Sequence, residues 1–408
     1  MELSDRVNSI KPSTTLGVAA RVKELKAQGV DVIGFGAGEP DFTTPENIIE
    51  TAIEALREGK THYAPVPGEL NARAAIARKL KNENGIACSA SDIVISTGAK
   101  QSIYLALQCL LDPGKGQEVI VPTPAWVSYF PMVSLAGGTV IEVPGAVDND
   151  FRMTPEQLEQ AITPRTRAMI INNPSNPCGT MYPPDEMRAL GEVLAKHERI
   201  TIISDEIYEK LVYGDCAPFS LGAMDSLAGR VITINGMSKA YAMTGWRIGY
   251  ACSPAPDGDE SPMAKAMAKL QSQMTSCITS FCYRAIIEAL ENSADAVESM
   301  RETFAKRGAL MHGLLSAMPG LVCPKPTGAF YVFPDISAHF GKVSPEGRKI
   351  DSALTFAEAL LEEAKVAVVP GNDFGEAGKN HVRLSFACSD ENITEGCKRM
   401  GEWLRTLS

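Results

Sequence analysis

The chain has 408 residues, of which 45% are hydrophobic and 22% charged, as in globular proteins of two or three domains. Its net charge of −10 excludes an overall electrostatic attraction to nucleic acid or to an anionic membrane. The first residues are polar, so no signal peptide is predicted. Apolar runs such as 366–369 are too short to span a bilayer, so no membrane segment is predicted either.

The first predicted helix begins near residue 45. The run TTPE at 43–46 is typical of a helix start, with a threonine cap and a proline in the first turn. We expect the buried face of this helix to consist of Ile49, Ala52, Ile53 and Leu56.

Short apolar runs alternate with helical stretches in the middle of the chain. The predicted strands are Asp92–Thr97, Glu118–Pro122, Thr139–Pro144, Ala168–Asn172, Thr201–Asp205, Val231–Ile234 and Arg247–Cys252. The helical stretches include Lys100–Leu111, Pro184–His197 and Pro262–Glu291. This alternation predicts an α/β large domain over 46–300, in which helices cover both faces of a mostly parallel sheet.

The last hundred residues have a different rhythm. The pattern predicts helices at Arg301–Met318 and Asp390–Leu407 and strands at Ala329–Phe333, Ala367–Val369 and Val382–Phe386. We expect a smaller α+β domain over 301–408, with the N-terminal segment 1–45 packed against it.

The ten cysteines and five histidines are dispersed along the chain. This spacing predicts neither a disulfide framework nor a metal site, and it favours reduced cysteines in a cytoplasmic protein.

The strongest local signal is GMSKAYAMTGWRIG at 236–249, which contains Lys239 and Arg247. A lysine that is buried near other cations has a lowered pKa and can form an imine, and an arginine offers a planar fork for a phosphate. An isolated lysine in a glycine-rich turn is more commonly a solvated surface residue. The surrounding sequence favours the first interpretation.

This segment resembles the cofactor-lysine signature of class I pyridoxal-phosphate-dependent aminotransferases. The resemblance implies the fold of the fold-type I PLP-dependent transferases, with Lys239 holding pyridoxal 5'-phosphate as a Schiff base. It also implies a two-stage exchange, in which one amino acid gives its amino group to the cofactor and a second 2-oxo acid receives it. Lys239 is then the base that moves the Cα proton.

Further polar residues follow predicted strands, where a doubly wound sheet places its ligands. Asp205 ends the strand in IISDEIYEKL, and a carboxylate there keeps a pyridine nitrogen protonated. Tyr208, three residues later, is placed to bond the cofactor's phenolic oxygen. Asn176, in the loop INNPSNPCGT, corresponds to the family asparagine that bonds the same oxygen.

The remaining cofactor contacts follow from the same resemblance. STGAKQSIY opens a helix whose first amides, at Ala99 and Lys100, are expected to bind the phosphate. In PTPAWVSY, Trp126 is expected to stack on the pyridine ring. Tyr63, in HYAP, resembles the tyrosine that reaches the phosphate of the neighbouring subunit, which implies a homodimer with shared active sites.

Several residues are candidates for binding a small amino acid or 2-oxo acid. Arg383, in HVRLSFA, matches the family's α-carboxylate arginine, and the amide of Gly38, in FGAGEPDF, resembles a second contact. Trp126 and Asn176 are expected to touch substrate as well as cofactor. Lys100 aligns with a lysine that binds the distal carboxylate in the bacterial aspartate aminotransferase branch, and Lys11 with one used by members that accept prephenate.

The sequence therefore predicts transfer of the amino group of L-aspartate to 2-oxoglutarate, with prephenate amination as a second activity. An aminotransferase for another amino acid (aromatic or alanine) and a PLP-dependent lyase, decarboxylase or synthase of the same fold remain alternatives. A DNA-binding regulator built on this fold is a further alternative. It is disfavoured because no basic patch and no N-terminal helix-turn-helix extension stand out in the sequence.

Overall fold

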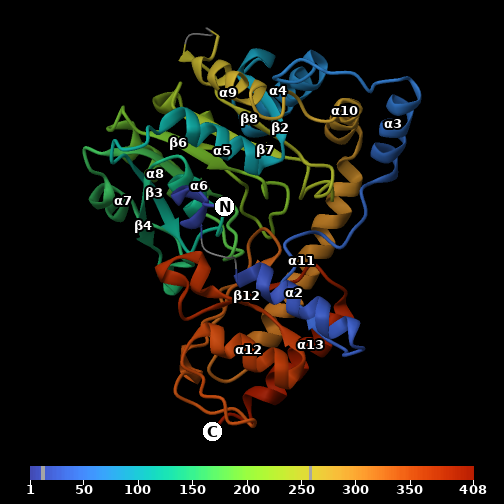
Figure 1. Ribbon diagram of the computed structural model, residues 1–408, viewed down its shortest axis with the longest axis vertical. Helices are drawn as coiled ribbons and strands as arrows, with labels where there is room; N and C mark the ends of the chain where they lie inside the picture. The colour runs from blue at the N-terminus through green and yellow to red at the C-terminus, as the bar shows by residue number, and fades with distance from the viewer. Residues whose placement is uncertain (11–13, 257–259) are drawn as a thin grey trace.

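The computed structural model describes residues 1–10, 14–256 and 260–408. Figure 1 shows an upper part built around a large sheet and a lower part that contains the C-terminal residues. Within the described residues, no helix combines the length and the apolar character needed to cross a membrane.

The large sheet confirms the predicted α/β architecture. It contains β2 (Ile93–Thr97), β3 (Glu118–Thr123), β4 (Thr139–Pro144), β5 (Thr166–Asn172), β6 (Thr201–Asp205), β7 (Val231–Gly236) and β8 (Ile248–Cys252). The strand order is β2-β8-β7-β6-β5-β3-β4. β8 runs antiparallel to both of its neighbours, whereas all other pairs are parallel. Each strand end lies within two residues of its predicted position.

Helices cover both faces of this sheet because its strands are apolar on both sides. In β5, Ile170 belongs to a core with α5, α6 and α9, whereas the next residue, Ile171, belongs to a core with α8 on the opposite face. The helices around the sheet are α3 (Glu46–Arg57), α4 (Leu70–Asn84), α5 (Ala99–Leu110), α6 (Tyr129–Leu135), α7 (Pro155–Ala161), α8 (Pro184–Ala195), α9 (Pro262–Ser272) and α10 (Cys282–Asn292).

The lower part is a second, smaller α+β unit. An antiparallel sheet has the order β11 (Val369–Pro370), β12 (Val382–Ser385), β9 (Tyr331–Val332), and β1 (Ile33–Gly34) pairs with β10 (Val366–Ala367). Its helices are α11 (Ala294–Ser316), α12 (Ala353–Ala364) and α13 (Asp390–Leu404), and the N-terminal α1 (Asp5–Asn8) and α2 (Thr14–Ala27) precede β1. Leu25, in the last turn of α2, packs with Leu361 of α12, so the N-terminal segment contacts this unit (Figure 1).

One predicted helix is two helices. The sequence predicts Pro262–Glu291 as a continuous helix, but α9 ends at Ser272 and α10 begins at Cys282. The intervening residues are rich in serine and threonine, which have weak helix propensity, and Ser276 has a positive φ of 60°. At this break the side chain of Gln271 donates to the carbonyl of Ile95 at 2.9 Å, which ties the end of α9 to β2.

The prediction for α3 differs from the structure at the start of the helix and in most of its buried face. Pro45 occupies the N-cap, and no side chain caps the helix. The Thr44 hydroxyl instead donates to the Ala242 carbonyl at 2.9 Å and accepts from the Trp246 indole at 3.0 Å. The buried residues of α3 are Ile48, Ala52 and Ala55, whereas Ile49 and Ile53 are only partly buried and Leu56 is 43% exposed.

Candidate active site

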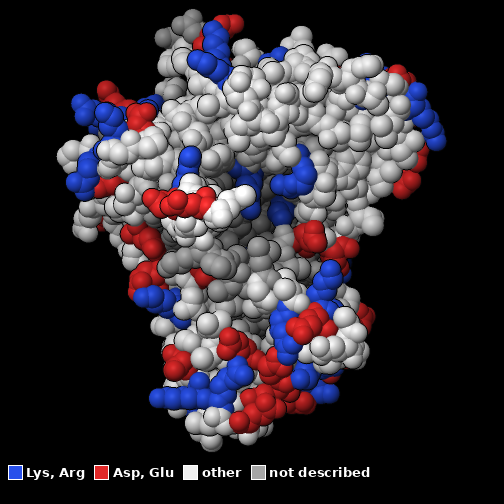
Figure 2. Space-filling view, in the orientation of Figure 1, with Lys and Arg blue, Asp and Glu red and all other residues white. Residues whose placement is uncertain are grey.

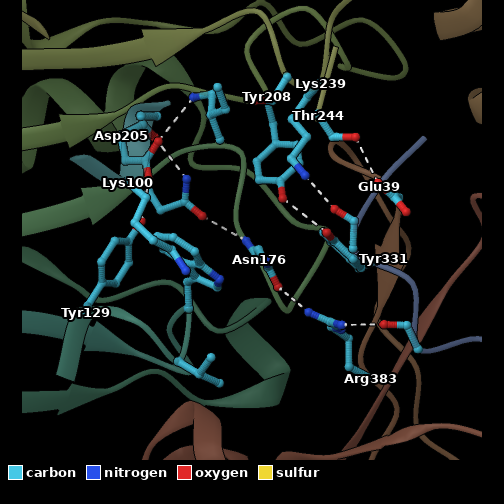
Figure 3. Close-up of a pocket in the computed structure, with 18 of the residues that line it drawn as sticks. Glu39, Lys100, Tyr129, Asn176, Asp205, Tyr208, Lys239, Thr244, Tyr331 and Arg383 are labelled. Carbon is cyan, nitrogen blue, oxygen red and sulfur yellow. Dashed lines mark hydrogen bonds between the residues drawn. The ribbon is translucent and has the colours of Figure 1, made fainter. Parts of the chain in front are cut away.

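A cavity of about 370 Å³ lies between the two parts, at the edge of the sheet where β6 and β7 end. Figure 2 shows this hollow with basic side chains at its wall, and Figure 3 shows its interior. The predicted site residues that line it are Gly38, Ala99, Lys100, Trp126, Asn176, Asp205, Tyr208, Lys239, Arg247 and Arg383. Every predicted motif therefore contributes a residue to this cavity, except the two motifs that contain Tyr63 and Lys11.

The two other candidates are not in this cavity. Tyr63 is 92% exposed and lines a separate, open concavity together with Cys277 and Phe281. Lys11 lies outside the described residues, so its predicted role is untested.

Asp205 ends β6 and its carboxylate is buried, with only 3% of the residue exposed. The Tyr129 hydroxyl donates to its Oδ2 at 2.6 Å, and the Ile207 amide donates to Oδ1 at 3.3 Å (Figure 3). Burial raises the pKa of Asp205 to about 6, and these hydrogen bonds oppose the rise. A cation beside this carboxylate would lower its pKa again, so the position suits a protonated ring nitrogen.

Lys239 lies in the loop between β7 and β8, and its Nζ donates to the carbonyl oxygen of Gly38. Burial lowers the pKa of Lys239 to about 8, and the positive charges of Arg383 and Arg247 act in the same direction. Glu39 opposes the shift. A lysine of this kind is partly neutral near pH 8 and can act as a nucleophile or as a base.

This lowered pKa gives a testable pH dependence. Only the neutral amine attacks an aldehyde, so the rate of pyridoxal phosphate uptake by the apoprotein should rise through a midpoint near pH 8 and then level off. Stopped-flow absorbance measures this rate. Because the charge of Glu39 raises the pKa of Lys239, Glu39→Gln should move the midpoint to lower pH. A midpoint at 10.5, the ordinary lysine value, would contradict the assignment.

A phosphate cradle lies where β2 meets α5. Gly98 has a φ of +81°, and a Cβ atom there would be 2.6 Å from Nη2 of Arg247, so only glycine lets the guanidinium approach the turn. α5 begins at Ala99, and the first amides of a helix have no partner within it. Free amides and a guanidinium together bind a dianionic phosphate.

Arg383 lies on β12 with only 4% of the residue exposed. Its Nη1 donates to Oδ1 of Asn176 at 3.1 Å and its Nη2 to the Gly36 carbonyl at 3.0 Å. Its Nε is buried without a partner among the described residues. A buried guanidinium with an unused donor is suited to binding a carboxylate.

Two pairs of aromatic and polar side chains complete the cavity. The hydroxyls of Tyr208 and Tyr331 lie 3.1 Å apart. On the other side, the ammonium of Lys100 is 4.8 Å from the ring centre of Trp126. Burial lowers the pKa of Lys100, and Arg247 adds to this effect. The cavity therefore has cations both at Arg383 and at Lys100 (Figure 3).

The cavity is also lined by residues that the sequence did not single out, among them Glu39, Tyr129, Thr244 and Tyr331. Thr244 donates to Oε2 of Glu39 at 2.8 Å, which joins the lysine loop to the N-terminal segment. Tyr129 and Thr244 lie in the motifs around Trp126 and Lys239, so their hydroxyl groups were the feature of the sequence that could have marked them as site residues. For Tyr331 the sequence predicts only a position in a strand.

The match to known proteins agrees with this geometry. The family model described as aminotransferase class I and II matches residues 30–400. The chain belongs to this family. This confirms the family and the class of enzyme that the lysine motif predicts.

Full-length relatives support the bacterial aspartate branch of the family. The chain is 45% identical to the aspartate/prephenate aminotransferase of Cereibacter sphaeroides, covering 100% of this chain and 99% of the relative. It is also 45% identical to the aspartate aminotransferase of Geobacillus stearothermophilus, covering 99% of each.

Solved structures of the same branch have the same fold. The aspartate aminotransferase of Rhizobium meliloti is similar with a TM-score of 0.94 at 40% identity, over 100% of both chains. That of Thermus thermophilus with maleate has a TM-score of 0.90 at 43% identity, over 98% of this chain and 99% of the other. The fold-type I class predicted from the lysine motif is thereby confirmed.

The family implies pyridoxal phosphate, and the cavity fits it. The cradle at Gly98 offers amides and Arg247 to a phosphate, and a buried carboxylate at Asp205 suits the ring nitrogen. Lys239 offers an amine of lowered pKa to the aldehyde. The volume is also in the range of small-molecule sites.

Proposed function

We propose that the protein transfers the amino group of L-aspartate to 2-oxoglutarate by a ping-pong reaction that uses pyridoxal 5'-phosphate. The observation that carries this proposal is the position of Lys239, an amine of lowered pKa in a cavity that also holds the cations Arg383 and Lys100. Both proposed substrates are dicarboxylates, so two cations in one cavity match their two charges.

The bound cofactor would act as an electron sink that stabilises negative charge at the substrate Cα. Asp205 would hold a proton on the ring nitrogen, with Tyr129 fixing the carboxylate. Tyr208 and Asn176 would donate to the phenolic oxygen, and Trp126 would stack on the ring. The amides of Ala99 and Lys100 and the guanidinium of Arg247 would hold the phosphate. Lys100 would thus offer its main-chain amide to the phosphate and its side chain to the substrate.

Arg383 would bind the α-carboxylate, assisted by the amide of Gly38, and Lys100 the distal carboxylate. With both ends of the substrate held, its Cα proton lies in a fixed direction toward Lys239. The neutral amine of Lys239 would remove this proton and return it to a carbon atom of the cofactor. The burial that lowers its pKa keeps a useful fraction neutral near pH 8.

A panel of amino donors tests the proposal. The loaded enzyme should turn over aspartate with 2-oxoglutarate faster than it turns over alanine or aromatic donors, measured by the glutamate that every donor forms from 2-oxoglutarate. With aspartate alone it should release oxaloacetate in stoichiometric amount. Release of ammonia or carbon dioxide instead would favour the lyase or decarboxylase alternative.

Replacement of Lys100 should separate substrates by charge. In Lys100→Ala, kcat/KM for aspartate should fall about 100-fold because a buried carboxylate loses its partner, whereas alanine should change less than about threefold. Steady-state kinetics with both donors measures the ratio. The exposed Lys115→Ala serves as the control. Equal losses for the two donors would reject the contact with the distal carboxylate.

Amination of prephenate is proposed as a second activity, with Lys11 as a contact. It is supported by the names of relatives such as the Cereibacter sphaeroides enzyme. Prephenate supplied as the acceptor to the aspartate-loaded enzyme tests it, and Lys11→Ala should reduce this activity more than that with 2-oxoglutarate.

We also propose a homodimer in which Tyr63 reaches the cofactor phosphate of the partner subunit. Tyr63 is 92% exposed, and Leu56, Leu70 and Met274 are further exposed apolar side chains within residues 46–300. Tyr63→Phe should weaken cofactor binding about tenfold, as expected for a lost hydrogen bond to a charged group, without changing the mass measured by sedimentation. A fully active monomer would contradict this proposal.

The domain limits are proposed at about residues 45 and 300, as the sequence rhythm suggests. A cytoplasmic location is proposed as well, since all ten cysteines are free thiols.

A further inference from the structure

The segment 205–209 has two sides. Asp205 and Tyr208 line the proposed active site, whereas Glu206 and Glu209 line a different cavity behind it. Both glutamates are buried, with 4% and 9% of the residue exposed. Two acidic side chains therefore lie behind the two residues that are proposed to contact the cofactor ring.

A buried lysine of α4 joins this acidic side. Lys79 is 7% exposed, and its Nζ forms an ion pair with Glu209. The same Nζ donates to Oδ1 of Asn84 at 2.7 Å. Asn84, where α4 ends, in turn donates to Glu209 at 2.5 Å and to Glu206 at 3.2 Å. One helix thus holds both glutamates.

Glu206 has further partners. The hydroxyls of Ser204 and Ser220 donate to its Oε1 at 2.8 and 2.6 Å. Burial and the charge of Glu209 raise the pKa of Glu206 to about 7, and Lys79 opposes the rise. Near Lys79, a carboxylate oxygen of Glu83 lies 3.6 Å from the Lys79 ammonium and 2.6 Å from the Lys210 ammonium. The side chains of Glu83 and Lys210 are more exposed than that of Lys79.

We propose that Lys79 is a positioning residue: through its ion pair with Glu209 and its bond to Asn84, it fixes the segment that presents Asp205 and Tyr208 to the cofactor. This inference rests on the proposed roles of Asp205 and Tyr208. Lys79 itself touches neither the active-site cavity nor its proposed ligand, since it lies on the opposite side of the segment.

The charge balance explains why the lysine is needed. Without it, the carboxylates of Glu206 and Glu209 would be buried near each other with no buried cation beside them. Such groups either take up protons or move toward water. Movement of either glutamate would turn the backbone between them, and this backbone carries Tyr208 and follows Asp205 directly.

The test uses Lys79→Met, which keeps the length of the side chain and removes its charge. Cofactor affinity is measured by titrating the apoprotein with pyridoxal phosphate, and the pH midpoint of the visible absorbance is recorded for the loaded protein. We expect affinity to fall about tenfold or more and the absorbance midpoint to shift. Arg78→Met is the matched control, because Arg78 precedes Lys79 on α4 and forms an exposed ion pair with Glu291.

A double variant separates charge from shape. Lys79→Met combined with Glu209→Gln removes both charges, and it should bind the cofactor more tightly than Lys79→Met alone. If Lys79→Met does not fold, Asn84→Ala replaces it, because this change removes the bridge between the glutamates but keeps the ion pair; it should also shift the absorbance midpoint.

Two outcomes would overturn the inference. One is an affinity and a midpoint equal to wild type in Lys79→Met, or in Asn84→Ala where that variant is used. The other is a loss of thermal stability in the apoprotein with no change in either readout, which would assign Lys79 a purely structural role. A wild-type protein that binds no pyridoxal phosphate would instead contradict the proposed function.

Discussion

The Lys239→Ala protein should lose steady-state transamination by about 10⁴-fold or more while it still binds pyridoxal phosphate through the phosphate cradle. Lys239 is proposed both to hold the cofactor and to move the Cα proton, and no other lysine side chain among the described residues lines the cavity except Lys100. A coupled assay with aspartate and 2-oxoglutarate measures the loss.

The exposed Lys265→Ala, which breaks an ion pair with Glu260, is the control and should keep wild-type turnover. Borohydride reduction of the loaded wild-type protein, followed by peptide mapping, should find the cofactor on Lys239. A label on another side chain, or appreciable turnover by Lys239→Ala, would refute the central assignment.

Replacement of Asp205 by asparagine should lower kcat by about 10³-fold, because an amide does not hold a proton on the ring nitrogen as a carboxylate does. The change keeps the size of the side chain and leaves an oxygen that can accept from Tyr129. Steady-state kinetics on fully loaded protein measures the effect.

Tyr129→Phe should have a smaller effect in the same direction, about tenfold, since it removes one hydrogen bond from the Asp205 carboxylate. A comparison of the two variants therefore orders the contributions of the carboxylate and of its donor. An Asp205→Asn enzyme with near wild-type kcat would exclude the proposed contact with the ring nitrogen.

Much of the site could be predicted from the sequence because chemistry and topology agree there. Asp205 is the last residue of an apolar strand, and the carboxyl ends of neighbouring parallel strands meet at one edge of the sheet. Lys239 and Arg247 lie in one motif, so their proximity followed from the sequence alone. The family resemblance then supplied the roles of these residues.

The features that the sequence did not predict depend on contacts between distant segments. The hydroxyl of Thr44 forms hydrogen bonds with residues 242 and 246 rather than with its own helix, and no residue near Thr44 in the sequence indicates these partners. The sequence predicts no break at 273–281, because the apolar pattern on either side outweighs the weak helix propensity of the serine and threonine residues between them. The partner of Glu39, Thr244, lies about two hundred positions away.

The reversed direction of β8 has a consequence for how the site is assembled. Register pairs Gly236 with Gly249 and Thr97 with Ile248, so the beginning of β8 is level with the ends of β7 and β2. The single connection between β7 and β8, residues 237–247, therefore brings both the amine of Lys239 and the guanidinium of Arg247 to one edge of the sheet. Had this strand run the other way, its first residue would lie at the opposite edge of the sheet, and Arg247 could not take its proposed place at the cofactor phosphate.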